Sequence, residues 1–108
     1  MNNNPHLQTV ADLLASPLLK EFPGTQDLSI TALMSPSNLL AKFKAAYGMS
    51  LYEYYTDQRL KRARELLQSG LSILETASEI GYGNIGHFTA AFQKKFGFPP
   101  GHTEIQLQ

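Results

Sequence analysis

The sequence predicts an all-helical protein, and three observations support that fold class. Leu and Ala are abundant, with 16 and 10 residues, whereas Ile and Val number only five and one. β-branched side chains pack well on a pleated sheet, so this balance favours helices over strands. Apolar residues recur at helical spacing, and residues that cap helices stand where the helices would begin and end.

Two short helices are expected in the first third of the chain. The first is limited by Pro17 and has four apolar residues on one face: Leu7, Val10, Leu13 and Leu14. Residues 17–24 leave the local structure open: Leu18, Leu19 and Phe22 are apolar, and Pro23-Gly24 ends any element that forms there. Thr25 is expected to cap a second helix that runs to about Leu33.

Two longer helices follow. Ser35 and Pro36 are a hydroxyl N-cap and a first-turn proline, and Gly48 ends the helix that they start. Its expected buried stripe is Leu39, Leu40, Phe43 and Tyr47. Ser50 and Glu53 form a capping box that opens a long helix closed by Gly70. The stripe of this long helix is Leu51, Tyr54, Leu60, Ala63, Leu66 and Leu67.

The last third predicts a short helix and a longer one. Ser72 and Glu75 are a second capping box, before a helix that Gly81 ends. Its apolar residues are Ile73, Ala77 and Ile80. Asn84 is expected to cap the next helix, whose stripe is Phe88, Phe92 and Phe96 and whose end is Gly97. Pro99-Pro100 prevents continuation, and Ile105 and Leu107 in the tail are expected to dock on the body.

The chain contains an internal repeat. The series Leu39, Phe43, Tyr47, Gly48 recurs 49 residues later as Phe88, Phe92, Phe96, Gly97, and Ala41 recurs as Ala90. In each copy a short helix, a tight turn and a longer helix follow one another. That order is typical of a helix-turn-helix unit, whose second helix enters the major groove of DNA. The alternative is that two unrelated amphipathic helices both end in Gly.

The repeat divides the chain into three parts. We expect a first subdomain at residues 1–48, a linker helix at 49–70 and a second subdomain at 71–108, with about seven helices in homeodomain-like three-helical subdomains. A linker helix from Leu51 to Ser69 would be about 28 Å long at ~1.5 Å per residue. Successive major-groove faces lie about 34 Å apart, so this linker predicts two reading helices near consecutive turns of DNA.

The candidate DNA-binding residues lie opposite the predicted core side of each second helix. With Phe43 and Phe92 at the centres of the core sides, the outward sides are rich in small residues, and Lys residues flank them. Small residues let a helix approach base edges, and Lys suits phosphates. The candidates are Ser35, Ser37, Asn38, Ala41, Lys42, Lys44 and Ala45 in the first copy, and Asn84, Gly86, His87, Thr89, Ala90, Gln93 and Lys94 in the second. The alternative is that they are ordinary exposed residues.

Charge is patterned although the net charge is zero. Eight of the nine basic residues fall within 35–48, 59–64 and 84–101, and these stretches contain no Asp or Glu. The alternative is that these stretches are ordinary solvated faces, which would show the same pattern. Arg59, Lys61, Arg62 and Arg64 lie on successive faces of the linker helix, so they cannot all contact DNA. Arg59 is expected to form an internal structural pair with a carboxylate such as Asp57 or Glu65.

Other classes of protein have little support. Gly81-Tyr-Gly-Asn-Ile-Gly86 matches a nucleotide-binding pattern but lacks the strand that should precede it. His6, His87 and His102 are far apart and predict no metal site, and no catalytic residue or cofactor is expected. There is no Cys, no membrane span and no secretory signal, which favours a cytoplasmic location. A helical protein-interaction module without a DNA role is the alternative function.

Residues 27–100 resemble the C-terminal DNA-binding domain of AraC/XylS-type transcription regulators. The resemblance rests on DLSITALMSPSNLLAKFKAAYGMS (27–50), YYTDQRLKRARELL (54–67) and SILETASEIGYGNIGHFTAAFQKKFG (72–97). It implies seven helices, two helix-turn-helix units joined by a long helix, and double-stranded DNA as partner. It also implies a regulator, often an activator that touches RNA polymerase, with an effector or dimerisation domain on the N-terminal side and absent from this chain.

Several positions depart from the family pattern. Members often have Arg where this chain has Ala41 and Ala90, so bidentate base readout is lost there. Gly86 replaces a common Ser. The ending Pro99–Glu104 lacks the family's aromatic residue and Arg. The resemblance therefore predicts DNA binding, without predicting which bases are read.

Overall fold

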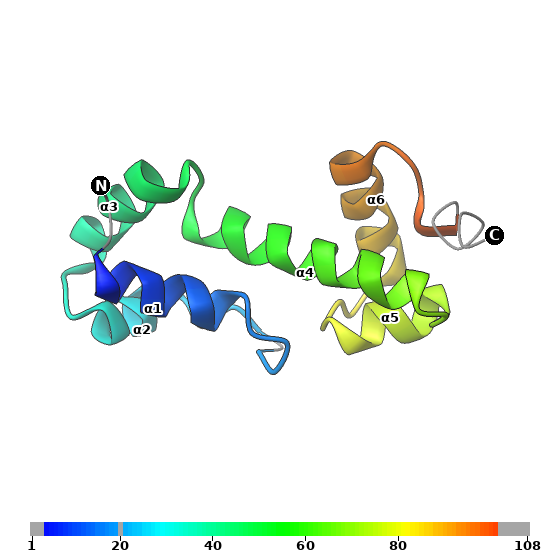
Figure 1. Cartoon of the computed structure of the whole chain (residues 1–108), viewed down its shortest axis with the longest axis horizontal. Coiled ribbons are helices and arrows are strands. Elements are labelled where there is room, and N and C mark those ends of the chain that lie inside the picture. The colour runs from blue at the N-terminus through cyan, green and yellow to red at the C-terminus, as the bar shows by residue number, and fades with distance from the viewer. Residues whose placement is uncertain (1–3, 20, 102–108) are drawn as a thin grey trace. The chain divides into compact units, whose positions relative to one another are not determined.

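The computed structural model describes residues 4–19 and 21–101, and in that part the chain is helical with no strand. Six helices are present (Figure 1): α1 Pro5–Leu14, α2 Thr25–Ala32, α3 Pro36–Tyr47, α4 Leu51–Gln68, α5 Ile73–Glu79 and α6 Ile85–Phe96. This confirms the all-helical prediction, with six described helices where about seven were expected. Pro100 and Gly101 also have helical backbone, and the proposed docking of Ile105 and Leu107 lies outside the described residues.

The chain forms two compact units, Met1–Gln58 and Arg59–Gln108. Helix α4 crosses the boundary between them and supplies apolar residues to both cores. Its first part contributes Leu51 and Tyr55 to the core of the first unit. Its second part contributes Leu60, Ala63 and Leu67 to the core of the second unit. Each unit therefore has a hydrophobic core of its own.

The first unit packs α1, α2 and α3 against one another and against the start of α4. Leu28, Leu39 and Phe43 are completely buried at its centre. The connection before α2 also contributes, since the Phe22 ring lies 5.5 Å from the ring of Tyr55, centroid to centroid. Sequence reasoning assigned no element to this connection and did not identify Tyr55 as a core residue.

The second unit packs α5 and α6 against the second part of α4. Phe88 and Phe92 are completely buried, and their ring centroids lie 5.8 Å apart. The Pro100 ring is also fully buried. Helix α6 ends at Phe96, before the two prolines, as the sequence predicts.

The two units repeat the same three-helix arrangement. Buried residues of α1 correspond to those of α4 at an offset of 53, as Leu7 to Leu60, Val10 to Ala63 and Leu14 to Leu67. Helices α3 and α6 correspond at the predicted offset of 49. The Phe43–Tyr47 ring centroids are 4.4 Å apart and the Phe92–Phe96 centroids 4.6 Å. The repeat thus includes a third helix in each unit that sequence reasoning did not align.

The turns between the repeated helices differ in length by one residue. Each turn is closed by a hydrogen bond from a backbone amide to the carbonyl five residues before it. Met34 N donates to Ser29 O at 3.1 Å, and Tyr82 N donates to Ala77 O at 2.9 Å. Ser35 follows Met34 directly as the next N-cap, whereas Gly83 stands between Tyr82 and the corresponding cap. Helices α2 and α5 therefore correspond at an offset of 48, and Gly83 is the additional residue.

Two predictions about single residues were wrong. Thr25 is the first helical residue of α2, and the cap position belongs to Gly24, whose φ of 95° is unfavourable for other residues. Leu40 was assigned to the buried stripe of α3, yet 46% of it is exposed. It neighbours the buried Leu39 in sequence, and a rotation of ~100° carries it out of the core.

Candidate nucleic-acid interface

Helix α3 begins and ends as its sequence predicts. The Ser35 hydroxyl accepts a hydrogen bond from the Asn38 amide at 3.3 Å, and Pro36 occupies the first turn. Gly48 ends the helix with a φ of 77°, and its amide donates to the Lys44 carbonyl at 2.8 Å. These two ends fix which residues of α3 face away from the core.

All seven candidate residues of the first copy are exposed. They are Ser35, Ser37, Asn38, Ala41, Lys42, Lys44 and Ala45. Leu39 and Phe43 lie on the other side of the same helix and are completely buried. The exposed side of α3 therefore combines small residues with lysines, and the residue at its centre, Ala41, has only a methyl side chain.

Helix α6 presents a similar exposed side. The Asn84 side chain accepts a hydrogen bond from the His87 amide at 2.9 Å and caps the helix. A Cβ at position 86 would lie only 3.1 Å from Asn84 Oδ1, so Gly86 leaves the capping oxygen room. Six of the seven candidates are exposed and Thr89 is half-buried: Asn84, Gly86, His87, Thr89, Ala90, Gln93 and Lys94.

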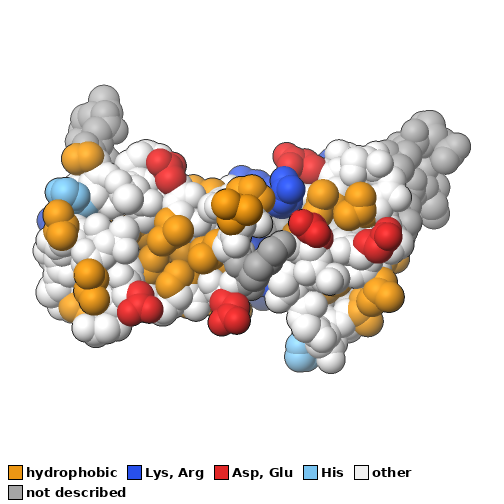
Figure 2. Space-filling model, turned by 90° about the horizontal axis from the view of Figure 1, so that it is seen from below, with side chains coloured by type: hydrophobic (Ala, Val, Ile, Leu, Met, Phe, Trp, Pro, Cys, Tyr) orange, Lys and Arg blue, Asp and Glu red, His pale blue; other side chains and the backbone are white. Residues whose placement is uncertain are grey.

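The lysines give these exposed sides their positive charge. Lys42, Lys44 and Lys94 are exposed, whereas Lys95 is half-buried with its Nζ 5.4 Å from the centre of the Phe96 ring. On the face shown in Figure 2, acidic and hydrophobic side chains lie open over both units, without a continuous basic surface. The positive charge on the exposed sides of α3 and α6 therefore comes from Lys42, Lys44 and Lys94.

Two arginines of α4 contact the second unit. Arg59 Nε donates to the Ile80 carbonyl at 2.9 Å, and its guanidinium carbon lies 4.1 Å from the centre of the Tyr82 ring. Arg59 was expected to pair with a carboxylate, and the two contacts described here are with a carbonyl oxygen and an aromatic ring. Arg64 is exposed, with its guanidinium carbon 5.2 Å from the centre of the Phe96 ring.

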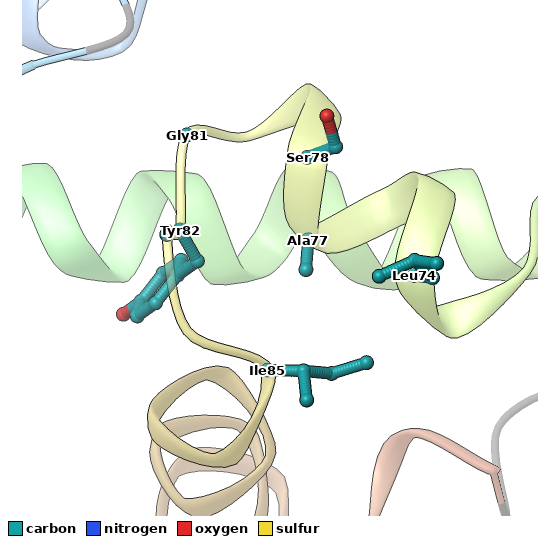
Figure 3. Close-up of a pocket in the computed structure, with 7 residues that line it drawn as sticks. Leu74, Ala77, Ser78, Gly81, Tyr82 and Ile85 are labelled. Atoms are coloured by element: carbon teal, nitrogen blue, oxygen red, sulfur yellow. The ribbon is translucent and has the colours of Figure 1, made fainter.

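A shallow groove of about 450 Å³ lies beside the turn between α5 and α6 (Figure 3). Leu74 and Ala77 of α5 face the same space as Ile85 at the start of α6. Tyr82 is the only titratable residue in its lining, which offers no pair of groups for acid–base catalysis. Gly81 and Gly83 of the nucleotide-binding pattern line the groove, but helix α5 precedes them where that motif needs a strand.

The described part of the chain holds no group of three or more His, Asp or Glu residues that could bind a metal ion. Within residues 4–19 and 21–101, no helix combines the length and the apolar character that crossing a membrane would require.

Comparison with known sequences identifies the family. The family profile described as "Helix-turn-helix domain" matches residues 28–104, which is more than half of the chain. A putative AraC-like transcription regulator from Streptomyces lividans is 38% identical over 76 residues, covering 69% of this chain and 25% of the relative. The chain spans about a quarter of the length of the curated relatives it matches.

Solved structures show the same fold. A transcriptional regulator from Chromobacterium violaceum, described as containing an AraC-type DNA-binding domain, is 28% identical with a TM-score of 0.86, and the match covers 95% of this chain and 92% of that one. The DNA-binding domain of AdpA, solved in complex with a target DNA, is 22% identical with a TM-score of 0.83 over 93% of this chain and 90% of that one. The second likeness concerns the fold alone.

Proposed function

The chain belongs to the AraC-type family of helix-turn-helix DNA-binding domains of transcription regulators, and on that premise we propose that α3 and α6 are its two reading helices. Their exposed sides enter successive major grooves of double-stranded DNA. The observation that carries the proposal is the duplicated arrangement of a capped helix with a buried aromatic stripe and a small-residue outer side.

Each candidate residue has a role that follows from its chemistry. Ala41 and Ala90 let the helix axes approach the base edges, and their methyl groups can contact thymine methyls. Lys42, Lys44 and Lys94 contact phosphates and fix the position of the protein without reading sequence. The remaining candidates contact the sugar–phosphate backbone of DNA or the base edges: Ser35, Ser37, Asn38, Ala45, Asn84, Gly86, His87, Thr89 and Gln93.

The proposal extends to the longer protein. We propose that this module works in the cytoplasm as part of a regulator that also has an effector or dimerisation domain, because the curated relatives are about four times as long. We also propose activation through contact with RNA polymerase, on the basis of the family resemblance.

A protein-interaction module is the second candidate, because Ile30, Leu33 and Leu74 are each about two-thirds or more exposed. Salt dependence separates the two functions. Binding to DNA releases counterions and weakens steeply as salt rises, whereas an apolar protein interface responds less.

The test starts from selection of a preferred site out of random duplex DNA. The double variant Lys44→Ala, Lys94→Ala should then weaken binding to all duplexes alike, and the slope of log affinity against log salt should become about two units shallower. Lys61→Ala with Lys95→Ala removes the same charge elsewhere and serves as the matched control. A slope for the Lys44, Lys94 double variant that equals the wild-type slope would remove Lys44 and Lys94 from the interface.

A further inference from the structure

We infer that Arg59 is a positioning residue for the second reading helix: it holds the α5–α6 turn in place so that α6 meets DNA already oriented. This inference rests on the proposed function. It concerns a residue outside the candidate contact set, and it assigns that residue a role in affinity without contact with DNA.

Arg59 makes two contacts that connect α4 with the α5–α6 turn. Arg59 reaches from α4 to the end of α5, where its Nε donates to the Ile80 carbonyl at 2.9 Å. Its guanidinium also lies over the Tyr82 ring at 4.1 Å, within the range of a cation–π interaction. The Tyr82 ring in turn lies 5.6 Å from the completely buried Phe88 ring of α6, centroid to centroid. A continuous series of contacts thus joins α4, the turn and α6.

The α5–α6 turn contains two glycines. Tyr82 stands between Gly81 and Gly83, and glycine backbone loses more conformational freedom on ordering than any other residue. Gly81 has a φ of 88°, and Gly83 is the residue that the first unit lacks. A turn with two glycines has little intrinsic preference for one conformation, so side-chain contacts add to the backbone hydrogen bond from Tyr82 N to Ala77 O in selecting it.

The two units differ at the positions of Arg59 and Tyr82. The position of Arg59 corresponds to His6 in α1, which is exposed, and the position of Tyr82 corresponds to Met34. The first turn, Leu33-Met34, contains no glycine. The guanidinium–ring contact is therefore found in the unit whose turn is longer and richer in glycine, where a restraint has the larger effect.

The variants Arg59→Gln and Arg59→Lys test this inference. Both lose the stacked guanidinium, and Arg59→Lys keeps the positive charge. We expect each to weaken binding of the selected duplex about tenfold, from one hydrogen bond and one cation–π contact, with the salt slope unchanged. If Arg59→Lys binds like the wild type, or if Arg59→Gln lowers the salt slope by about one, Arg59 contacts phosphate and the inference is overturned.

Rescue by a second substitution distinguishes the positioning role of Arg59 from a general loss of stability. A Cβ at position 83 meets nothing within 4 Å, and the backbone there lies outside the left-handed region, so Gly83→Ala stiffens the turn without strain. It should restore about two- to fivefold of the affinity lost in Arg59→Gln and change wild-type affinity less than twofold. An equal effect in both backgrounds overturns the inference.

Two further measurements keep the outcomes distinct. If Arg59→Gln does not fold, Tyr82→Leu removes the ring under the guanidinium and should give the same loss and the same rescue; a Tyr82→Leu variant with wild-type affinity overturns the inference. Failure of the wild-type chain to bind any duplex would instead reject the proposed function itself. Circular dichroism and the thermal midpoint establish folding of every variant.

Discussion

At Thr76 the second unit buries a hydroxyl group that has no hydrogen-bond partner. The residue is completely buried, and the oxygen accepts and donates nothing within the described structure. Leu28 occupies the corresponding position of the first unit and is also completely buried. The site is therefore built for an apolar side chain, and the hydroxyl lowers stability there.

Thr76→Val should increase the free energy of unfolding by about 1 kcal/mol, because it keeps the shape of the side chain and removes an unsatisfied polar atom. Denaturant unfolding followed by circular dichroism measures the change. Thr31→Val is a matched control on an exposed part of α2 and should stay within about 0.5 kcal/mol of the wild type. A destabilised Thr76→Val would mean that the hydroxyl has a partner, such as a buried water.

Leu33 has a left-handed backbone with a φ of 58° at the end of α2, and 74% of it is exposed. Leu33→Gly should stabilise the first unit by about 0.5–1 kcal/mol, since the steric cost of this conformation exceeds the entropy that glycine adds to the unfolded chain. The reverse change in the second unit, Gly81→Leu, should destabilise it by about 1–2 kcal/mol. Opposite signs for the two variants in thermal unfolding check the argument.

Single residues were predicted well where local chemistry decides the outcome. Ser35 and Asn84 accept the capping bonds expected of them, because a helix N-terminus offers free amides to the nearest side-chain oxygen. The exposure of Leu40 and the partners of Arg59 depend on tertiary packing, and the spacing of residues along the chain does not contain that information.

At the scale of elements, two capping boxes start α4 and α5. Ser50 N donates to Glu53 Oε1 at 2.8 Å while Glu53 N donates to Ser50 Oγ at 3.1 Å. Ser72 and Glu75 exchange the same bonds at 2.9 and 3.0 Å. Hydrogen bonds from the serine backbone amides, and then from the serine hydroxyls, lower the pKa of both carboxylates.

These lowered pKa values predict the direction of a pH effect. The folded state binds fewer protons than the unfolded state, so the stabilisation is complete above the usual glutamate pKa of 4.5 and is lost as pH falls through the lower folded values. Glu53→Gln with Glu75→Gln keeps a side-chain oxygen as acceptor and should flatten the acid limb of a plot of stability against pH. Glu65→Gln removes an exposed carboxylate outside the boxes and should leave that limb steep.

Helix boundaries were the most predictable feature of the elements. Gly48 and Gly97 end α3 and α6 with φ values of 77° and 85°, as their place after an aromatic stripe predicts. The correspondence of α1 with the second part of α4 was not predicted, because α4 reads in sequence as one uninterrupted helix. Its division between two cores becomes visible only when the contacts of Tyr55 and Leu60 are known.

At the scale of the whole molecule, α4 contributes residues to two cores. Affinity for DNA is therefore predicted to depend on the number of residues in α4 between these cores. One Ala inserted after Gln58 rotates the second part of α4 by about 100° relative to the first while leaving the residues of each core together. Affinity for the selected duplex should fall at least tenfold, because one unit must then dissociate or distort the DNA.

Gln58→Ala is the control for that insertion and should bind like the wild type. Circular dichroism and thermal unfolding should show both units folded in the inserted chain. Unchanged affinity would mean that the two units bind DNA independently, and the proposal of paired reading helices would have to be abandoned.

The largest difference in length between the two units lies in the connection before the helix-turn-helix. The connection from α1 to α2 covers residues 15–24, whereas that from α4 to α5 covers only 69–72. The longer one is also a working part of the first unit, since its Phe22 ring packs against Tyr52 and Tyr55. The helices of the two units thus keep their register although this connection differs in length, and any epitope or fluorophore grafted into residues 15–24 would have to spare Phe22.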